Sequence, residues 1–300
     1  MKRAWLILLL VLLPGCSGTK MFYDQLDRLA PQYLEKYVPL TTEQEILLAR
    51  EIAELRRWHC GTQLAAYAGW LRAVSADVQA GDVTYAGVER HYAGLQGFWK
   101  ELMRQMSPGA AELLLTMSDA QVDQLFRRLE QDNDKLEAER RKPSAAGQRR
   151  KSAGMMERQL TRWVGVLSPS QREAVAAWSA RLAPDQGESG AARRSWQAQL
   201  RRLLQQRADT RAFRAGVRTL LAQPEQYWPP GYRRVSAANR EQTLRLLADI
   251  GASLTPEQRE YFARRAASWA RDFDQIACGG YAPRPAHDPG VPSQRPAVAP

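Results

Sequence analysis

The sequence predicts an all-α protein, a multi-helix bundle of stacked helical hairpins. Apolar side chains recur at helical spacings of three and four, and capping-box motifs recur along the chain. No stretch shows the alternation of apolar and polar residues that strands need. Apolar residues make up 44% of the 300 residues and nine are Trp, which is the composition of a folded protein with a sizeable core.

The N-terminus has the layout of an export signal. Two positive residues precede the apolar run 4–13, which is about half the ~20 residues needed to span a bilayer. Leu13-Pro14-Gly15-Cys16 then resembles the lipobox of bacterial lipoproteins, in which the cysteine is lipidated and becomes the first residue. We therefore expect a cleaved signal peptide at 1–15, a lipid anchor on Cys16 and a tether at 16–20.

The anchor also indicates a compartment. In familiar lipoprotein sorting, Asp after the lipidated cysteine favours the inner membrane. Ser17 stands there, which predicts the inner leaflet of the outer membrane, with the helices facing the periplasm. The expected partners are the membrane through Cys16 and either protein clients or anionic envelope components, and no nucleic acid.

Charge gives a second hint about partners. Loss of residues 1–15 removes two positive residues and lowers the formal net charge from +11 to +9. Arginine pairs are spread along the chain between Asp and Glu, which is typical of solvated helix faces. Binding of anionic lipid head groups or acidic polymers is the alternative.

The helices can be placed in order from their starts. The first amphipathic stretch is 21–38, with a kink or interruption expected at Pro31. Three capping boxes follow, in which a hydroxyl caps the helix and a Gln three residues later reaches back: Thr41 with Gln44, Ser168 with Gln171, and Thr255 with Gln258. A looser copy is Ser118 with Gln121. The further helices are expected at 41–78, 84–106, 118–141, 153–166, 168–182, 191–206, 210–222, 237–251 and 255–277.

Composition divides the chain into two helical halves. Residues 143–152 are rich in Pro, Gly, Ser and charge, which predicts a linker between an N-terminal half (21–142) and a C-terminal half (153–278). Residues 279–300 hold six prolines and no apolar period, so a disordered tail is expected.

Two cysteines remain once Cys16 is lipidated. Cys60 and Cys278 make an even pair in an oxidising compartment, and each lies beyond a capping box of related sequence. We expect a disulfide between them, with their two helices packed side by side and parallel. In that arrangement the two cysteines lie about 6 Å apart along the helix axis. A bend at the Gly279-Gly280 helix end, or a shift of one helix by one turn along the other, would close this gap. The alternative is two unrelated buried thiols.

No motif predicts a reaction, a metal or another cofactor. His59, His91 and His287 do not have metal-ligand spacing, and His59 falls on a packed helix face. We find no nucleophile elbow or phosphate loop, and expect no enzyme. The aromatic segment with Tyr227, Trp228 and Tyr232 is either a binding loop or a cap on the bundle.

Two family resemblances add to this interpretation. The positions that carry the first are Tyr23, Leu26, Asp27, Tyr37, Val38, Leu40, Gln44, Trp58 and His59. Directly behind a lipobox, they resemble a proteobacterial lipoprotein family known only as domain of unknown function 6279. Cys60 departs from it, because Arg is expected there.

The repeated boxes are similar to those of the periplasmic chaperones Spy and CpxP, which are all-helical cradles. That resemblance implies, as an alternative, a chaperone or envelope-stress sensor. The main expectation is a non-enzymatic binding or interaction module of the cell envelope.

Overall fold

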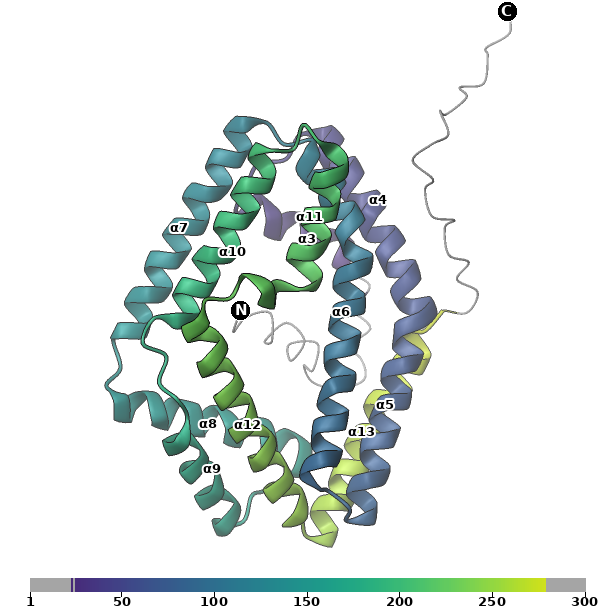
Figure 1. Cartoon of the computed structure of the whole chain (residues 1–300). Coiled ribbons are helices and arrows are strands. Elements are labelled where there is room, and N and C mark those ends of the chain that lie inside the picture. The colour runs from purple at the N-terminus through teal and green to yellow at the C-terminus, as the bar shows by residue number, and fades with distance from the viewer. Residues whose placement is uncertain (1–22, 24, 279–300) are drawn as a thin grey trace, which may run out of the picture.

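A computed structural model describes Tyr23 and residues 25–278, and this part of the chain is built from helices (Figure 1). The all-α prediction is therefore confirmed. The elements in order are α3 (Leu26–Glu35), α4 (Thr42–Trp58), the π-helix η1 (His59–Gln63), α5 (Leu64–Ala80), α6 (Tyr85–Leu115), α7 (Asp119–Arg141), α8 (Ala145–Val164), α9 (Pro169–Arg181), α10 (Glu188–Gln205), α11 (Thr210–Ala222), the 3-10 helix η2 (Pro224–Tyr227), α12 (Pro230–Ala252) and α13 (Pro256–Ile276). The signal peptide, Cys16 and the tail at 279–300 lie outside the described residues.

Three helix pairs tie the chain together. α5 packs on α13, α6 on α11, and α7 on α10 (Figure 1). Each pair joins one helix of the expected N-terminal half to one of the C-terminal half, so the halves form one interlocked body. α8, α9 and α12 form the lower left part of this body in Figure 1.

Three clusters of buried apolar residues hold the helices. The first lies between α6, α7, α10 and α11, around Phe126, Leu204 and Phe213. The second lies between the end of α5 and α8, α9, α12 and α13, around Val175 and Leu246. The third joins η1 and α5 to α13. The core is thus divided along an elongated set of long helices.

α5 and α13 are antiparallel, which corrects the expected parallel arrangement. Cys60 is bonded to Cys278, Arg72 pairs with Asp274, and Arg259 lies against Gly81. Residue numbers therefore rise along one helix as they fall along the other. The two cysteines meet because each lies about 20 residues from the end that the two helices share.

The helix after Ser144 corrects the expected linker. Ser144 accepts a hydrogen bond from the Gly147 N–H (3.1 Å), and α8 begins at Ala145, so most of residues 143–152 form its first turns. The connection shortens to the few residues around Pro143. A serine cap followed by two alanines outweighs the Gly and charge that suggested a linker.

Helix α6 also runs further than expected, through Pro108 to Leu115. A proline inside a helix leaves the carbonyl four residues earlier without its N–H donor. Here the buried Ser107 hydroxyl donates to that carbonyl, on Arg104, at 2.8 Å. The hydroxyl satisfies the acceptor, and the helix continues. α3 likewise passes through Pro31.

Candidate functional site

All four capping boxes form. In each, the side chain of the cap residue accepts from the Gln backbone N–H, and the Gln side chain accepts from the cap backbone N–H. Thr41, Ser118, Ser168 and Thr255 are the caps. The motifs that the sequence singled out are therefore helix starts, including the looser copy at Ser118.

The first two boxes are also joined to each other. Gln44 Nε2 donates to Gln121 Oε1 (3.1 Å), and Gln121 Nε2 donates back to Gln44 Oε1 (2.7 Å). The second hydrogen of each amide reaches the carbonyl two residues before the partner's cap. Gln44 binds the Thr116 carbonyl (3.1 Å), and Gln121 binds the Pro39 carbonyl (2.7 Å).

The last two boxes repeat this arrangement at the other end of the molecule. Gln171 and Gln258 exchange hydrogen bonds of 2.9 Å in both directions. Gln171 also binds the Ser253 carbonyl (3.2 Å), and Gln258 binds the Val166 carbonyl (2.8 Å). Both side chains are buried, with 2% and 8% exposed. The same four-part network thus fixes both pairs of helix starts.

This pairing decides what the glutamines do. Each amide oxygen accepts from its own cap and from the partner Gln, and each amide nitrogen donates twice. A pocket of about 560 Å³ opens beside the first pair, lined by Pro39, Leu40, Thr41, Glu43, Gln44, Thr116, Ser118 and Gln121. Because all the hydrogen-bonding groups of these amides already have partners, the glutamines hold pairs of helix starts together and leave no free group for a ligand.

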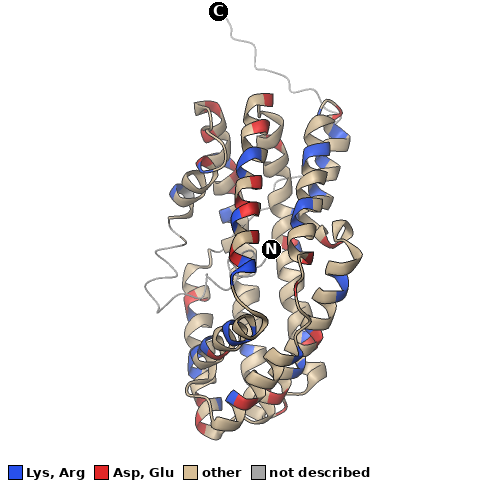
Figure 2. Ribbon diagram, turned by 90° about the vertical axis from the view of Figure 1, so that its left-hand side faces the viewer, with Lys and Arg blue, Asp and Glu red and all other residues tan. Residues whose placement is uncertain are grey.

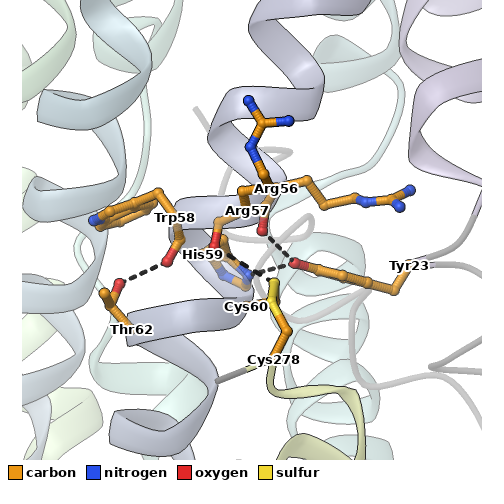
Figure 3. The surroundings of a disulfide bond; sticks show 8 residues. All are labelled: Tyr23, Arg56, Arg57, Trp58, His59, Cys60, Thr62 and Cys278. Carbon is orange, nitrogen blue, oxygen red and sulfur yellow. Dashed lines mark hydrogen bonds between the residues drawn. A yellow bond between two sulfur atoms is a disulfide. The ribbon is translucent and has the colours of Figure 1, made fainter. Parts of the chain in front are cut away.

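The disulfide lies at an irregularity in the long helix formed by α4 and α5. Residues His59–Gln63 form a π-helical turn, and Cys60 within it is bonded to Cys278 with the Cα atoms 5.2 Å apart (Figure 3). The Cys278 backbone N–H donates to the Cys60 carbonyl at 3.1 Å. The Thr62 hydroxyl donates to the Trp58 carbonyl at 2.7 Å. The end of α13 is thereby fixed to the middle of the longest helical column.

His59 stands beside the disulfide in a cluster of aromatic rings. Its ring lies 5.4 Å from that of Tyr67, which contacts the rings of Phe98 (4.8 Å) and Phe273 (5.8 Å). Tyr23 donates to the Arg56 carbonyl (3.1 Å) and its hydroxyl lies 3.3 Å from His59 Nδ1 (Figure 3). The chain thus brings the N-terminal Tyr23, the π-turn and the end of α13 together.

Burial sets the protonation of this cluster. Desolvation lowers the pKa of His59 to about 4, so the imidazole is neutral at pH 7. Desolvation also raises the pKa of Tyr67 above its usual range. These groups stay uncharged, in keeping with the expectation that His59 belongs to a packed helix face.

The aromatic segment near residue 228 is mostly structured. Tyr227 ends η2 and its carbonyl accepts from the Ser195 hydroxyl (2.7 Å), while Tyr232 lies in the first turn of α12. The rings of Trp228 and Tyr232 pack edge to face at 4.9 Å, and Trp228 Nε1 is buried with no hydrogen-bond partner. The aromatic segment is therefore mostly helical rather than a loop, and its role in binding stays a prediction.

A second histidine is tied to a carboxylate. His91 Nε2 lies 2.8 Å from Asp77 Oδ2, and Arg90 binds the same oxygen at 3.0 Å. The hydrogen bond from His91, with Arg90, lowers the pKa of Asp77. This contact joins α5 to α6. Among the side chains that the structure describes, no three from His, Cys, Asp or Glu are placed to share a metal ion.

Two residues of these sites were not singled out by the sequence as functional. Tyr67 and Phe98 belong to the aromatic cluster only because α5 and α6 bring them together.

No helix in the described part is long and apolar enough to cross a bilayer.

Comparison with known families identifies the chain as far as a family. The model of a family of unknown function, DUF6279, matches residues 36–233, and the chain belongs to this family. This confirms the resemblance from residue 36 to the start of α12, whereas Tyr23, Leu26 and Asp27 lie before the matched residues. Cys60 lies inside the matched region and Cys278 outside it. No curated protein and no solved structure matches, so the resemblance to Spy and CpxP stays a prediction.

Proposed function

We propose that this member of the family is a lipid-anchored protein of the bacterial cell envelope that acts as a non-enzymatic interaction module. Cys16 would hold it in the inner leaflet of the outer membrane, with the helical body in the periplasm. The observation that carries the proposal is the bond between Cys60 and Cys278. Such bonds persist in oxidising compartments, which is where the lipobox-like N-terminus would send the chain.

The form of the body supports an interaction role. Its converging polar groups, the two glutamine pairs, bind each other and fix helix starts. The disulfide closes a loop of 218 residues around the same frame. The glutamine pairs and the disulfide hold the long helices in place, so the outer faces of these helices form a rigid surface for a partner. Figure 2 shows basic and acidic positions interleaved along those faces.

Fractionation of membranes from the native host tests the proposal. We expect the wild-type chain in outer-membrane fractions, and Ser17→Asp, which leaves the lipobox-like segment intact, in inner-membrane fractions. Cys16→Ser serves as the control that removes the anchor site and should leave an uncleaved precursor. Wild-type protein in a soluble fraction, or an unchanged distribution for Ser17→Asp, would contradict anchoring or the outer-membrane assignment respectively.

A further inference from the structure

Helix α8 has the largest excess of basic over acidic residues among the described helices, four against three for α10 and for α11. It holds five basic residues, Arg149, Arg150, Lys151, Arg158 and Arg162, against one acidic residue, Glu157. Within the described part of the chain, no α8 side chain forms an ion pair. Some arginines of other helices are paired, as in Arg245 with Glu241 (2.7 Å) and Arg140 with Glu137 (3.1 Å). The positive charge of α8 is thus left for solvent or for a partner.

Three of these cations share one face with an apolar side chain. Lys151, Met155, Arg158 and Arg162 follow each other at spacings of four, three and four, which places them on one stripe of the helix. All four are exposed, Met155 by 44%. Glu157 is half-buried and lies about 100° from Arg158 around the helix axis. The α8 stripe, as we name these four residues, is therefore basic and partly apolar, with no acidic member.

More apolar surface lies where α8 ends. Val166 follows the helix and is 82% exposed, and Tyr261 of α13 is 38% exposed with its ring against Gly165. With Met155, these residues account for most of the exposed large apolar side chains in the described residues, the others being Tyr33 and Ile46. Exposed apolar side chains next to unpaired cations are typical of a surface that lies on a membrane.

The opposite face of α8 fixes the orientation of the stripe. Leu160 and Val164 are buried in the second core cluster, and the Trp163 ring lies 5.7 Å from that of Phe262. The stripe therefore cannot turn inward without breaking that core. None of its four residues belongs to the three buried core clusters of the described residues.

We propose that the α8 stripe, with Val166 and Tyr261, docks onto an anionic lipid bilayer. This proposal rests on the membrane anchoring proposed above and names the surface that faces the lipid. Guanidinium and ammonium groups bind phosphate head groups, while the apolar side chains enter the boundary between head groups and acyl chains. The positive charge of the stripe favours an anionic partner. The exposed apolar side chains beside it favour a bilayer, because a bilayer has an apolar phase directly below its anionic head groups.

The anchor can reach the same bilayer. Tyr23 lies seven residue steps after Cys16, a distance of at most about 25 Å for an extended chain. Tyr23 belongs to the cluster that contains Phe273, and Tyr261 lies twelve residues before Phe273 on α13, about 18 Å along the helix. One membrane surface can thus meet both the lipidated cysteine and the end of the α8 stripe.

A fluorescent reporter on the mature protein purified from membranes tests this surface. Met155→Cys introduces a free thiol, because Cys60 and Cys278 are bonded and Cys16 is lipidated, and an environment-sensitive dye can be attached there. Vesicles of phosphatidylcholine are compared with vesicles of phosphatidylcholine and phosphatidylglycerol at about 3:1. We expect a blue shift and a severalfold rise in emission on the anionic vesicles only, lost at high salt because screening weakens the contact.

Two matched controls separate docking from simple proximity. The dye at Ile46→Cys, another exposed apolar helix position (67%), should not respond to anionic lipid. In the Met155→Cys background, Arg158→Gln with Arg162→Gln should abolish the response. Arg211→Gln with Arg218→Gln, an equal loss of charge at exposed positions on α11, should leave it unchanged.

The outcomes decide the two proposals separately. Flotation of the protein with neutral vesicles reports the lipid anchor, whereas the Met155 reporter on anionic vesicles reports the stripe. Flotation with an unresponsive reporter overturns the stripe and leaves the anchor standing. Failure to float overturns the anchor; the Met155→Cys reporter is then read in a Cys16→Ser background, where position 155 alone carries the dye and decides whether the stripe binds anionic lipid. A response to a soluble anionic polysaccharide or to DNA, but not to vesicles, also overturns the stripe proposal.

Discussion

The buried pair Gln171 and Gln258 allows a quantitative prediction. Gln258→Ala removes the acceptor for the Thr255 N–H, the donor to Val166 and both hydrogen bonds to Gln171. Loss of the capping bond costs about 1 kcal/mol, and each buried polar group left without a partner costs about 1–3 kcal/mol. We expect either single alanine variant to lower the free energy of unfolding by about 2–4 kcal/mol.

The double variant separates the pair from the two caps. With both glutamines replaced, no buried amide is left without its hydrogen-bond partner. The loss of free energy of unfolding should therefore be smaller than the sum of the two single losses by at least about 1 kcal/mol. Denaturant unfolding of the four proteins, with equal slopes, measures this coupling. Gln205→Ala, at the exposed end of α10, should change the free energy of unfolding by less than about 0.5 kcal/mol. Additive losses at positions 171 and 258 would refute the reciprocal pair.

Three further predictions follow from the fold. Cys278→Ser should lower the free energy of unfolding by up to about 5 kcal/mol, because the bond closes a loop of 218 residues. The pKa of His59 is about 4 when folded and about 6.5 when unfolded, so the unfolded state binds more protons between these values and stability should fall by up to about 3 kcal/mol as pH drops through this window. His59→Phe should remove that part of the pH dependence. Ser107→Ala should cost about 1–2 kcal/mol, because the Arg104 carbonyl beside Pro108 loses its donor.

Each of these has a control. Reduced wild-type protein should match Cys278→Ser in unfolding measurements, and an oxidised wild-type chain that accepts two alkyl groups would contradict the bond. Equal pH profiles between pH 4.5 and 7 for wild type and His59→Phe would contradict a neutral buried imidazole. Thr219→Ala, whose hydroxyl bonds a carbonyl that already has a helical donor, should have little effect; an equal effect at Ser107 would contradict the special role of that hydroxyl.

Features set by nearby residues could be predicted from the sequence. A capping box needs only a hydroxyl and a Gln three residues later, so Thr41 with Gln44 and the three similar starts were found at their positions. The ends of the helix at Thr210–Ala222 were likewise correct. Predictions from local sequence were wrong at two places where one hydroxyl stabilises a helix. The Ser107 hydroxyl lets α6 continue past Pro108, and the Ser144 cap starts a helix within the expected linker.

Features that depend on topology could not be derived. The paired glutamines are separated by 77 positions in the first pair of capping boxes and by 87 positions in the second. The sequence around one glutamine does not indicate which other glutamine it will bind. The Cys60 bond was predicted from cysteine number and compartment, but its geometry was wrong because the sequence does not tell whether two packed helices are parallel. The π-turn at His59 and the exposure of the α8 stripe also become visible only when the helices are assembled.

Mass spectrometry of the N-terminus of the mature protein, purified from membranes, tests the central claim most directly. Anchoring through the lipobox-like segment predicts a chain that begins at Cys16 and carries the mass of a lipid on that residue. Labelled fatty acid should be incorporated into the wild-type chain and not into Cys16→Ser. A mature chain with another first residue, an unmodified Cys16 thiol, or label retained by Cys16→Ser would contradict a lipid-anchored envelope protein.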